Sequence, residues 1–217
     1  MKGKSDRMAK KALWFLVVCI LASIALSSCA KPESNEVYFI HAVGFDGHEK
    51  GVKMSVVLES AEKNKGKDAA SDEYFSVSFS GESLSETVSK LLSEYKRCYT
   101  GTAQMYFFSE SLSRRALYDV ALFVPSSPVF PSQSEAVALS SVTAEKVFNN
   151  IKNDEDMKKI KKLVNEDKVN VVGFFAGCTS PDSTVSLPAL TLDENEIVSD
   201  PKVFYRNCAR TQTLHLY

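Results

Sequence analysis

The chain has 217 residues, of which 44% are hydrophobic and 24% charged, and its formal net charge is -1 at pH 7. A hydrophobic fraction of this size excludes general disorder, and the length allows one large domain or two small ones. Because the basic residues form no stripe with interleaved aromatic residues, nucleic acid is not an expected partner.

The first 28 residues have the pattern of an export signal. Five basic residues precede an uncharged apolar run, against a single acid (Lys2, Lys4, Arg7, Lys10 and Lys11 against Asp6). The run at 12–26 has 15 residues, whereas a helix needs about 20 to span a bilayer. We therefore expect the signal to be removed, with an uncleaved signal anchor as the alternative.

The end of this run, Leu26-Ser27-Ser28-Cys29, resembles the lipobox of bacterial lipoproteins. In such proteins the cysteine thiol is acylated, with palmitate among the attached chains, and the chain is cut just before it. This resemblance implies cleavage between Ser28 and Cys29 and lipidation of Cys29. Two or more acyl chains hold a protein durably on a membrane.

The chain from Cys29 onward is mildly acidic, with 21 basic and 26 acidic residues. This charge offers no attraction to anionic lipid, so we expect membrane contact to depend on the lipid alone. Three cysteines remain after Cys29, namely Cys98, Cys178 and Cys208. They either include one internal disulfide or all serve as small buried hydrophobic residues, and their spacing does not decide between the two.

The next segments predict a tether, a hairpin and a loop. Residues 29–36 form a short polar segment, as expected of a tether. Residues 37–43 and 52–58 are rich in β-branched and aromatic side chains and predict two strands, joined by the glycine-rich turn 44–51. Residues 59–72 contain no large apolar residue and predict a loop.

A half-buried strand and a capped helix follow. Residues 74–79 alternate aromatic or β-branched residues with serine, which is typical of a strand with one buried face. Ser83 and Glu86 form a capping box, in which the Ser83 hydroxyl accepts from the Glu86 amide and the Glu86 side chain reaches back. Apolar residues then recur at helical spacing (Leu84, Val88, Leu91, Leu92 and Tyr95) and predict a helix that packs on a sheet.

The remaining residues predict a further mixture of strands and helices. Strands are expected at 103–108, 136–142, 169–176, 185–192 and 203–205, and helices at 112–123, 144–151 and 155–165, the last with Leu163 on its buried face. Pro125, Pro128 and Pro131 are expected to interrupt all regular structure. Because strands and helices do not alternate regularly, we expect a single α+β domain at 37–217, with helices packed on a mixed, largely antiparallel sheet.

No group of residues predicts a catalytic or metal-binding site. His41, Asp46 and His48 are close in sequence but lack any zinc-type spacing with cysteines, so no metal is expected. No serine has the Gly-x-Ser-x-Gly context of a nucleophile, and acids such as Glu82 stabilise the start of a capped helix. We therefore expect neither an enzyme nor a cofactor.

Several local patterns together resemble one known family. Residues 42–46 match a strand of the form apolar-x-Gly-apolar-Asp, and residues 81–87 match Gly-x-Ser/Thr-Leu-x-Glu-Ala at all but the last position. Tyr99, Gly101 and residues 105–112 match an aromatic residue, a glycine, an apolar strand and an acidic step into a second helix. This pattern, over about 37–151, resembles the N-terminal domain of the C-subunit lipoproteins of bacterial spore germinant receptors, the Ger(x)C family.

The chain departs from that family at three places. Thr102 stands where the family usually has histidine, and Ala30-Lys31 replaces the Trp-Asp that commonly follows the acylated cysteine. The proline-rich stretch 125–131 stands where a helix containing arginine is expected. Family members also continue through further domains, so the chain resembles a divergent first domain with a short extension.

The resemblance implies a function. A family member would be a lipid-anchored, non-catalytic receptor subunit on the outer face of the cytoplasmic membrane, which is the inner membrane of the spore. Its partners would be integral-membrane receptor subunits, contacted through the 44–51 turn and the start of the capped helix (Gly44, Asp46, Gly81, Ser83 and Glu86). The alternative is an unrelated surface lipoprotein, such as a solute-binding module or an uncharacterised hydrolase.

Overall fold

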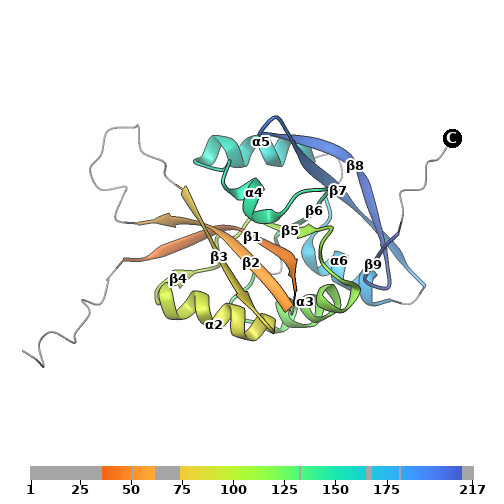
Figure 1. Ribbon diagram of the computed structural model, residues 1–217, viewed down its shortest axis with the longest axis horizontal. Helices are drawn as coiled ribbons and strands as arrows, with labels where there is room; N and C mark the ends of the chain where they lie inside the picture. Colours follow the sequence, from red (N-terminus) through yellow and green to blue (C-terminus); the bar gives the residue numbers. More distant parts are fainter. Residues whose placement is uncertain are drawn as a thin grey trace, which may run out of the picture. The chain divides into compact units, whose positions relative to one another are not determined.

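One mixed sheet of nine strands organises the computed structural model (Figure 1). The structure describes residues 36–49, 51–61, 74–131, 133–164, 168–180 and 182–211. The strands are β1 (Tyr38–His48), β2 (Gly51–Ser60), β3 (Tyr74–Gly81), β4 (Cys98–Tyr99), β5 (Met105–Ser109), β6 (Glu135–Leu139), β7 (Thr184–Asp193), β8 (Glu196–Arg206) and β9 (Ala209–Thr211). The helices are α2 (Leu84–Glu94), α3 (Arg114–Ser126), α4 (Ala144–Phe148), α5 (Asp154–Val164) and α6 (Val171–Thr179).

The sheet has a parallel centre and antiparallel flanks. Its order is β3-β2-β1-β5-β6-β7-β8-β9, and β4 pairs with the start of β1. The pairs β1–β5, β5–β6 and β6–β7 are parallel, whereas β2 and β3 on one side and β8 and β9 on the other pair antiparallel. The longest registers are antiparallel, so the predicted α+β class with a mixed, largely antiparallel sheet is confirmed.

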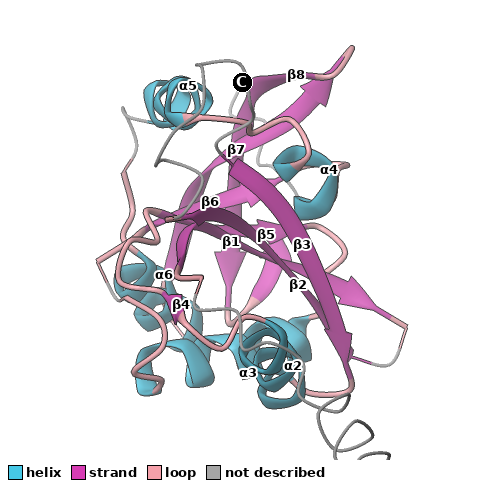
Figure 2. Ribbon diagram, turned by 90° about the vertical axis from the view of Figure 1, so that its left-hand side faces the viewer, coloured by secondary structure: helices cyan, strands magenta, loops and turns pink. Residues whose placement is uncertain are grey.

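Helices cover both faces of the sheet (Figure 2). Helices α2, α3 and α6 pack on one face, and α4 and α5 pack on the other. The side chains of the central strand β5 point alternately to the two faces of the sheet. Tyr106 and Phe108 pack in the core under α2, α3 and α6, and Met105 and Phe107 pack in the core under α4 and α5. All four side chains are essentially inaccessible, and β5 confirms most of the strand predicted at 103–108.

The β1–β2 hairpin is confirmed, but its strands run further than predicted. Strand β1 continues through Gly44 and Asp46 to His48, which is the register partner of Gly51. The predicted turn at 44–51 is therefore mostly strand. Gly44 lies within the strand, and its neighbours leave no room for a side chain at this position. Glycine is therefore needed here for the close approach of two elements and not for a turn.

The prediction of a strand at 169–176 is wrong, because this segment begins helix α6. The Asn170 side chain caps the helix by accepting from the Gly173 amide at 2.6 Å. The side chains that the helix buries follow helical spacing (Val171, Phe174, Phe175 and Cys178). The run of valines at 169, 171 and 172 favours a strand by propensity, and the cap together with packing on the core overrides it.

Two further details differ from the prediction. Pro125 lies inside α3, in its last turn, and does not end it. A proline there removes one helical hydrogen bond, while Val124 beside it is buried in the core. Leu163 in α5 is 39% exposed, and Met157, Ile160 and Val164 form the buried face of that helix.

The predicted export signal, Cys29 and most of the predicted tether fall at 1–35, outside the described residues. Most of the predicted loop at 59–72 also falls outside them, whereas Glu59 and Ser60 complete β2. Within the part of the chain that the structure describes, no helix has both the length and the apolar character needed to cross a membrane.

Candidate interaction surface

The five residues predicted to contact a partner divide into a buried pair and an exposed group. Gly44 and Asp46 are buried, and Asp46 is only 1% exposed. Ser83 and Glu86 are exposed and Gly81 is half-buried. The two groups therefore have different tasks, and only the second can contact another molecule directly.

Gly44 and Asp46 attach helix α4 to strand β1. A Cβ atom on Gly44 would lie 2.2 Å from Cβ of Ala144 and 3.0 Å from the Phe148 ring, so the helix sits directly on the backbone of the strand. The Asp46 Oδ1 atom accepts a hydrogen bond from the Ala144 amide at 2.9 Å and so satisfies a donor at the start of α4. The Gly-Phe-Asp sequence thus packs and caps one helix.

Burial controls the charge of Asp46. Loss of solvent raises the pKa of this carboxyl above its usual value of 3.8, although the Ala144 amide and then the Ser109 hydroxyl favour the ionised form. The Oδ2 atom has no well-directed hydrogen bond. Lys53, whose charge also favours the ionised form of Asp46, is itself paired with Glu145 at 2.5 Å.

We expect Asp46→Asn and Asp46→Ala to differ in both stability and pH dependence. Because the folded pKa is raised, the folded state holds a proton more tightly than the unfolded state, and stability falls as pH rises from about 3.8 through the folded pKa. Asparagine keeps the acceptor for the Ala144 amide and removes this fall. Alanine also removes this fall but leaves that buried amide without a partner, so its free energy of unfolding should lie about 1–3 kcal/mol below that of Asp46→Asn at every pH.

Urea unfolding of the three proteins across pH 4 to 8 measures both effects, because this range begins near the reference carboxyl pKa and extends upward from it. The wild-type protein should lose stability relative to Asp46→Asn as the pH rises. Equal stability of the asparagine and alanine variants at all pH values would contradict the capping role.

The exposed group lies where the β1–β2 hairpin meets the start of α2. The end of β1 and the start of β2 lie beside the end of β3 and the first turns of α2, around an open hollow of about 220 Å³. We call this the turn–helix surface, and its residues are His48, Glu49, Gly51, Ser80, Gly81, Glu82, Glu86 and Lys90. It brings together the two segments that the sequence predicted as contacts.

The capping box forms with one change. The Ser83 side chain accepts from the Glu86 amide at 3.2 Å, as predicted. The Glu86 carboxylate reaches the amide of Glu82 at 3.0 Å, one residue before the expected one. Because a Cβ on Gly81 would lie 2.7 Å from the Thr87 hydroxyl oxygen and 3.2 Å from the Glu86 carboxylate, this glycine lets the strand end close to the helix.

The turn–helix surface is acidic. Glu49, Glu82 and Glu86 contribute carboxylates, and Lys90 is the cation among these residues. Lys90 donates to Glu86 and to the Ser80 carbonyl, both at 2.7 Å. Its hydrogen bond and then that of the Glu82 amide lower the pKa of Glu86, so this carboxylate stays charged. A partner with basic or amide groups would match this surface.

His41 and His48 lie close in sequence but have different surroundings. His41 sits where the β1 register shifts, with Nε2 at 2.7 Å from Glu59 and its ring stacked on Tyr74. His48 lies at the hairpin end, where its Nδ1 accepts from the Glu49 amide at 2.8 Å. Among the described residues, no three metal-ligating side chains gather at one place.

The structure places two of the three cysteines together. Cys178 in α6 and Cys208 beside β9 are buried, and their side chains are hydrogen-bonded. Cys98 is half-buried, and burial raises the pKa of its thiol to about 11. All three are free thiols in this structure. Their burial keeps them protonated and slow to react.

The sequence did not indicate one polar hollow. It lies between α4, α5 and the β7–β8 turn, in two adjoining parts of about 380 and 630 Å³ that share Asn150 and Asn195. The turn is made by Glu194 and Asn195, which both adopt positive φ. The hollow could not be predicted locally, because its helical wall and the turn come from residues far apart in the sequence. Asp156 there already accepts from the Lys152 amide at 2.9 Å.

Comparison with known proteins agrees with the resemblance drawn from the sequence. Residues 31–191 match the family model described as the spore germination protein N-terminal domain, which is more than half of the chain. No curated protein and no solved structure matched. The alternative of an unrelated surface lipoprotein is therefore set aside. The chain belongs to the family of spore germination protein N-terminal domains, and its role is related to germinant receptors.

Proposed function

We propose that this chain is a lipid-anchored, non-catalytic subunit of a spore germinant receptor. It associates with integral-membrane receptor subunits on the outer face of the cytoplasmic, spore inner membrane and takes part in nutrient-triggered germination. The observation that carries the anchor is the sequence Leu26-Ser27-Ser28-Cys29 after a basic head and a short apolar run. Membership of the family supports the role in a germinant receptor.

The length of the tether constrains how the domain meets its partner. Residues 29–36 reach at most about 28 Å when fully extended. Strand β1 begins at Tyr38, next to the tether, and ends at His48, about 33 Å further on at the usual rise per residue. The turn–helix surface lies at that far end. It can therefore meet a receptor subunit if the domain lies along the membrane or if the subunit projects outward from the bilayer.

We expect Cys29→Ser to abolish incorporation of a fatty-acid analogue into the chain and to release the chain from membranes. Cys19→Ser is the matched control, because it removes a thiol from the apolar run that the signal peptidase would discard. Incorporation that survives Cys29→Ser would exclude the lipobox.

Germination of spores tests the receptor role separately. Spores that carry Cys29→Ser should germinate more slowly in at least one nutrient than spores that carry Cys19→Ser. Normal germination of deletion spores in every nutrient would contradict the receptor role even if the lipid is present.

A further inference from the structure

Strand β3 forms one edge of the sheet, and its sequence lacks the charges and the proline that usually protect such an edge (Figure 2). Its eight residues, Tyr74–Gly81, contain neither a charged residue nor a proline. Natural proteins normally protect an exposed edge with charges, proline or a very short strand, because such an edge can pair with another chain. The opposite edge has these features, since β9 has three residues and β8 carries Asp200, Pro201 and Lys202.

The backbone of β3 offers hydrogen bonds outward. The Tyr74 amide donates to the Lys152 carbonyl at 2.9 Å, so this amide points away from β2. Backbone groups alternate in direction along an antiparallel strand, and those of Ser76, Ser78 and Ser80 therefore also point outward. Lys90 uses the carbonyl of Ser80. Among the described residues, no strand pairs with the outward groups of Ser76 and Ser78.

The sequence of this edge reads the same in both directions. Residues 75–79 are Phe-Ser-Val-Ser-Phe, a palindrome centred on Val77. If two copies pair antiparallel about a twofold axis at Val77, each Phe75 lies opposite Phe79 of the other copy and each Ser76 opposite Ser78. Successive side chains point to opposite faces, so phenylalanines meet on one face and serines on the other.

We propose that β3 pairs with β3 of a second copy of this chain, antiparallel and centred on Val77, so that two nine-stranded sheets join edge to edge. A twofold interface places a patch against itself, so any charge near its axis would face a like charge. The charge-free strand avoids that repulsion. The cross-strand pairs of Phe75 with Phe79 would add aromatic contacts that stabilise the pairing.

Helix α2 fits the same arrangement. It packs on both β2 and β3, on the face where Phe75, Val77 and Phe79 are half-buried. With neighbouring strands about 4.8 Å apart, two α2 helices on either side of the axis would lie about 10 Å apart. This is the upper end of the usual distance between packed helices, about 8–10 Å. The half-buried Leu92 of α2 and its C-cap residue Tyr95 would gain cover from the second copy.

Oxidative cross-linking of the full-length chain tests the pairing and its register. Val77 directs its backbone groups toward β2, so Val77 and its symmetry mate would form a pair without mutual hydrogen bonds, with Cα atoms about 4.5 Å apart. That separation lies within the range of a disulfide. Val77→Cys should therefore give a covalent dimer under a mild copper oxidant. Ser199→Cys is the control, because it places an exposed cysteine on β8 near the opposite edge.

We expect at least on the order of tenfold more covalent dimer from Val77→Cys than from Ser199→Cys, because paired thiols have a much higher effective concentration than thiols that meet by chance. Adding Ser78→Pro should return the yield to the control level. Proline is tolerated at an edge where the amide points outward, and there it removes one donor of the pairing. Equal dimer yields from the two cysteine variants would overturn the proposal, as would an undiminished yield with Ser78→Pro in a protein that retains its circular dichroism.

Discussion

Replacing Gly44 by alanine should lower the free energy of unfolding by about 2–3 kcal/mol, the upper part of the range of about 1–3 kcal/mol that extra atoms cost in a packed core. At an unstrained site the same change stabilises a protein by about 0.4–1 kcal/mol, because it restricts the unfolded chain. The sign reverses here because the new methyl would lie 2.2 Å from Cβ of Ala144. Neither β1 nor α4 can move away easily, since both lie in the core. Urea unfolding at 25 °C measures the difference.

Two further variants separate this clash from a general effect of losing glycine. Gly101→Ala is the matched control, because the nearest atoms belong to the Tyr99 side chain, which is 59% exposed and can move. Ala144→Gly removes the opposing methyl, so the double variant Gly44→Ala/Ala144→Gly should recover much of the lost stability, with a coupling of about 1–3 kcal/mol. Equal effects of Gly44→Ala and Gly101→Ala, or strictly additive effects in the double variant, would contradict the close approach of strand and helix.

The Gly44 case shows where sequence reasoning reaches its limit in this chain. The sequence pattern singled out Gly44 and Asp46, but their contact at Ala144 lies 98 positions beyond Asp46. No local pattern connects those positions. The sequence therefore predicted only a contact with another protein, and the packing of these residues on helix α4 could not be read from it.

Features that depend on residues close together in the sequence were predicted well. The hairpin and the capped helix α2 depend on neighbours in sequence, and both are present. The turn–helix surface was partly predictable for the same reason, since Gly81, Ser83 and Glu86 lie within one helix start. Its other half, from the end of β1 and the start of β2, joins it only through the antiparallel register of β2 and β3, in which Val52 is opposite Gly81.

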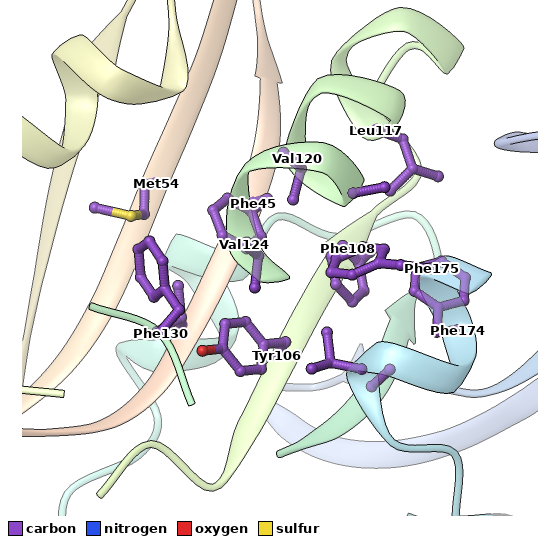
Figure 3. Packing of buried hydrophobic residues seen from close by; sticks show 14 of the residues in the cluster. Phe45, Met54, Tyr106, Phe108, Leu117, Val120, Val124, Phe130, Phe174 and Phe175 are labelled. Atoms are coloured by element: carbon purple, nitrogen blue, oxygen red, sulfur yellow. The ribbon is translucent and has the colours of Figure 1, made fainter. Parts of the chain in front are cut away.

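Helix α6 was not predicted because its local pattern fits two structures. The segment is apolar on nearly every side, and such a run fits a buried helix and a buried strand equally well by periodicity. Asn170 as a helix cap was the available sign, and the spacing of 171, 174, 175 and 178 supports it. The deciding interactions are distant in sequence. Phe174 packs against Phe108 of β5 (Figure 3), with ring centroids 4.9 Å apart. It also packs against Tyr205 of β8, with ring centroids 5.1 Å apart.

A helix and a strand at the position of α6 predict different effects for a pair of alanine substitutions. In helix α6, Phe174 is fully buried whereas Val172 is 42% exposed. Phe174→Ala should then cost about 3–5 kcal/mol, since it empties an aromatic site in the core. Val172→Ala should change stability by less than about 0.5 kcal/mol, and alanine's better helix propensity opposes any loss. Urea unfolding of the two variants under identical conditions gives the comparison.

A strand would produce a different result, because residues two positions apart in a strand point to the same face. Positions 172 and 174 would then be buried together, and both substitutions would be costly. Similar losses from Val172→Ala and Phe174→Ala would therefore contradict the helix, whereas a large loss at 174 alone would support it. The experiment also tests the core, because Phe174 fixes α6 against the same Phe108 that stands at the centre of the sheet. A small loss at 174 would mean that α6 does not depend on this contact for its place on the sheet.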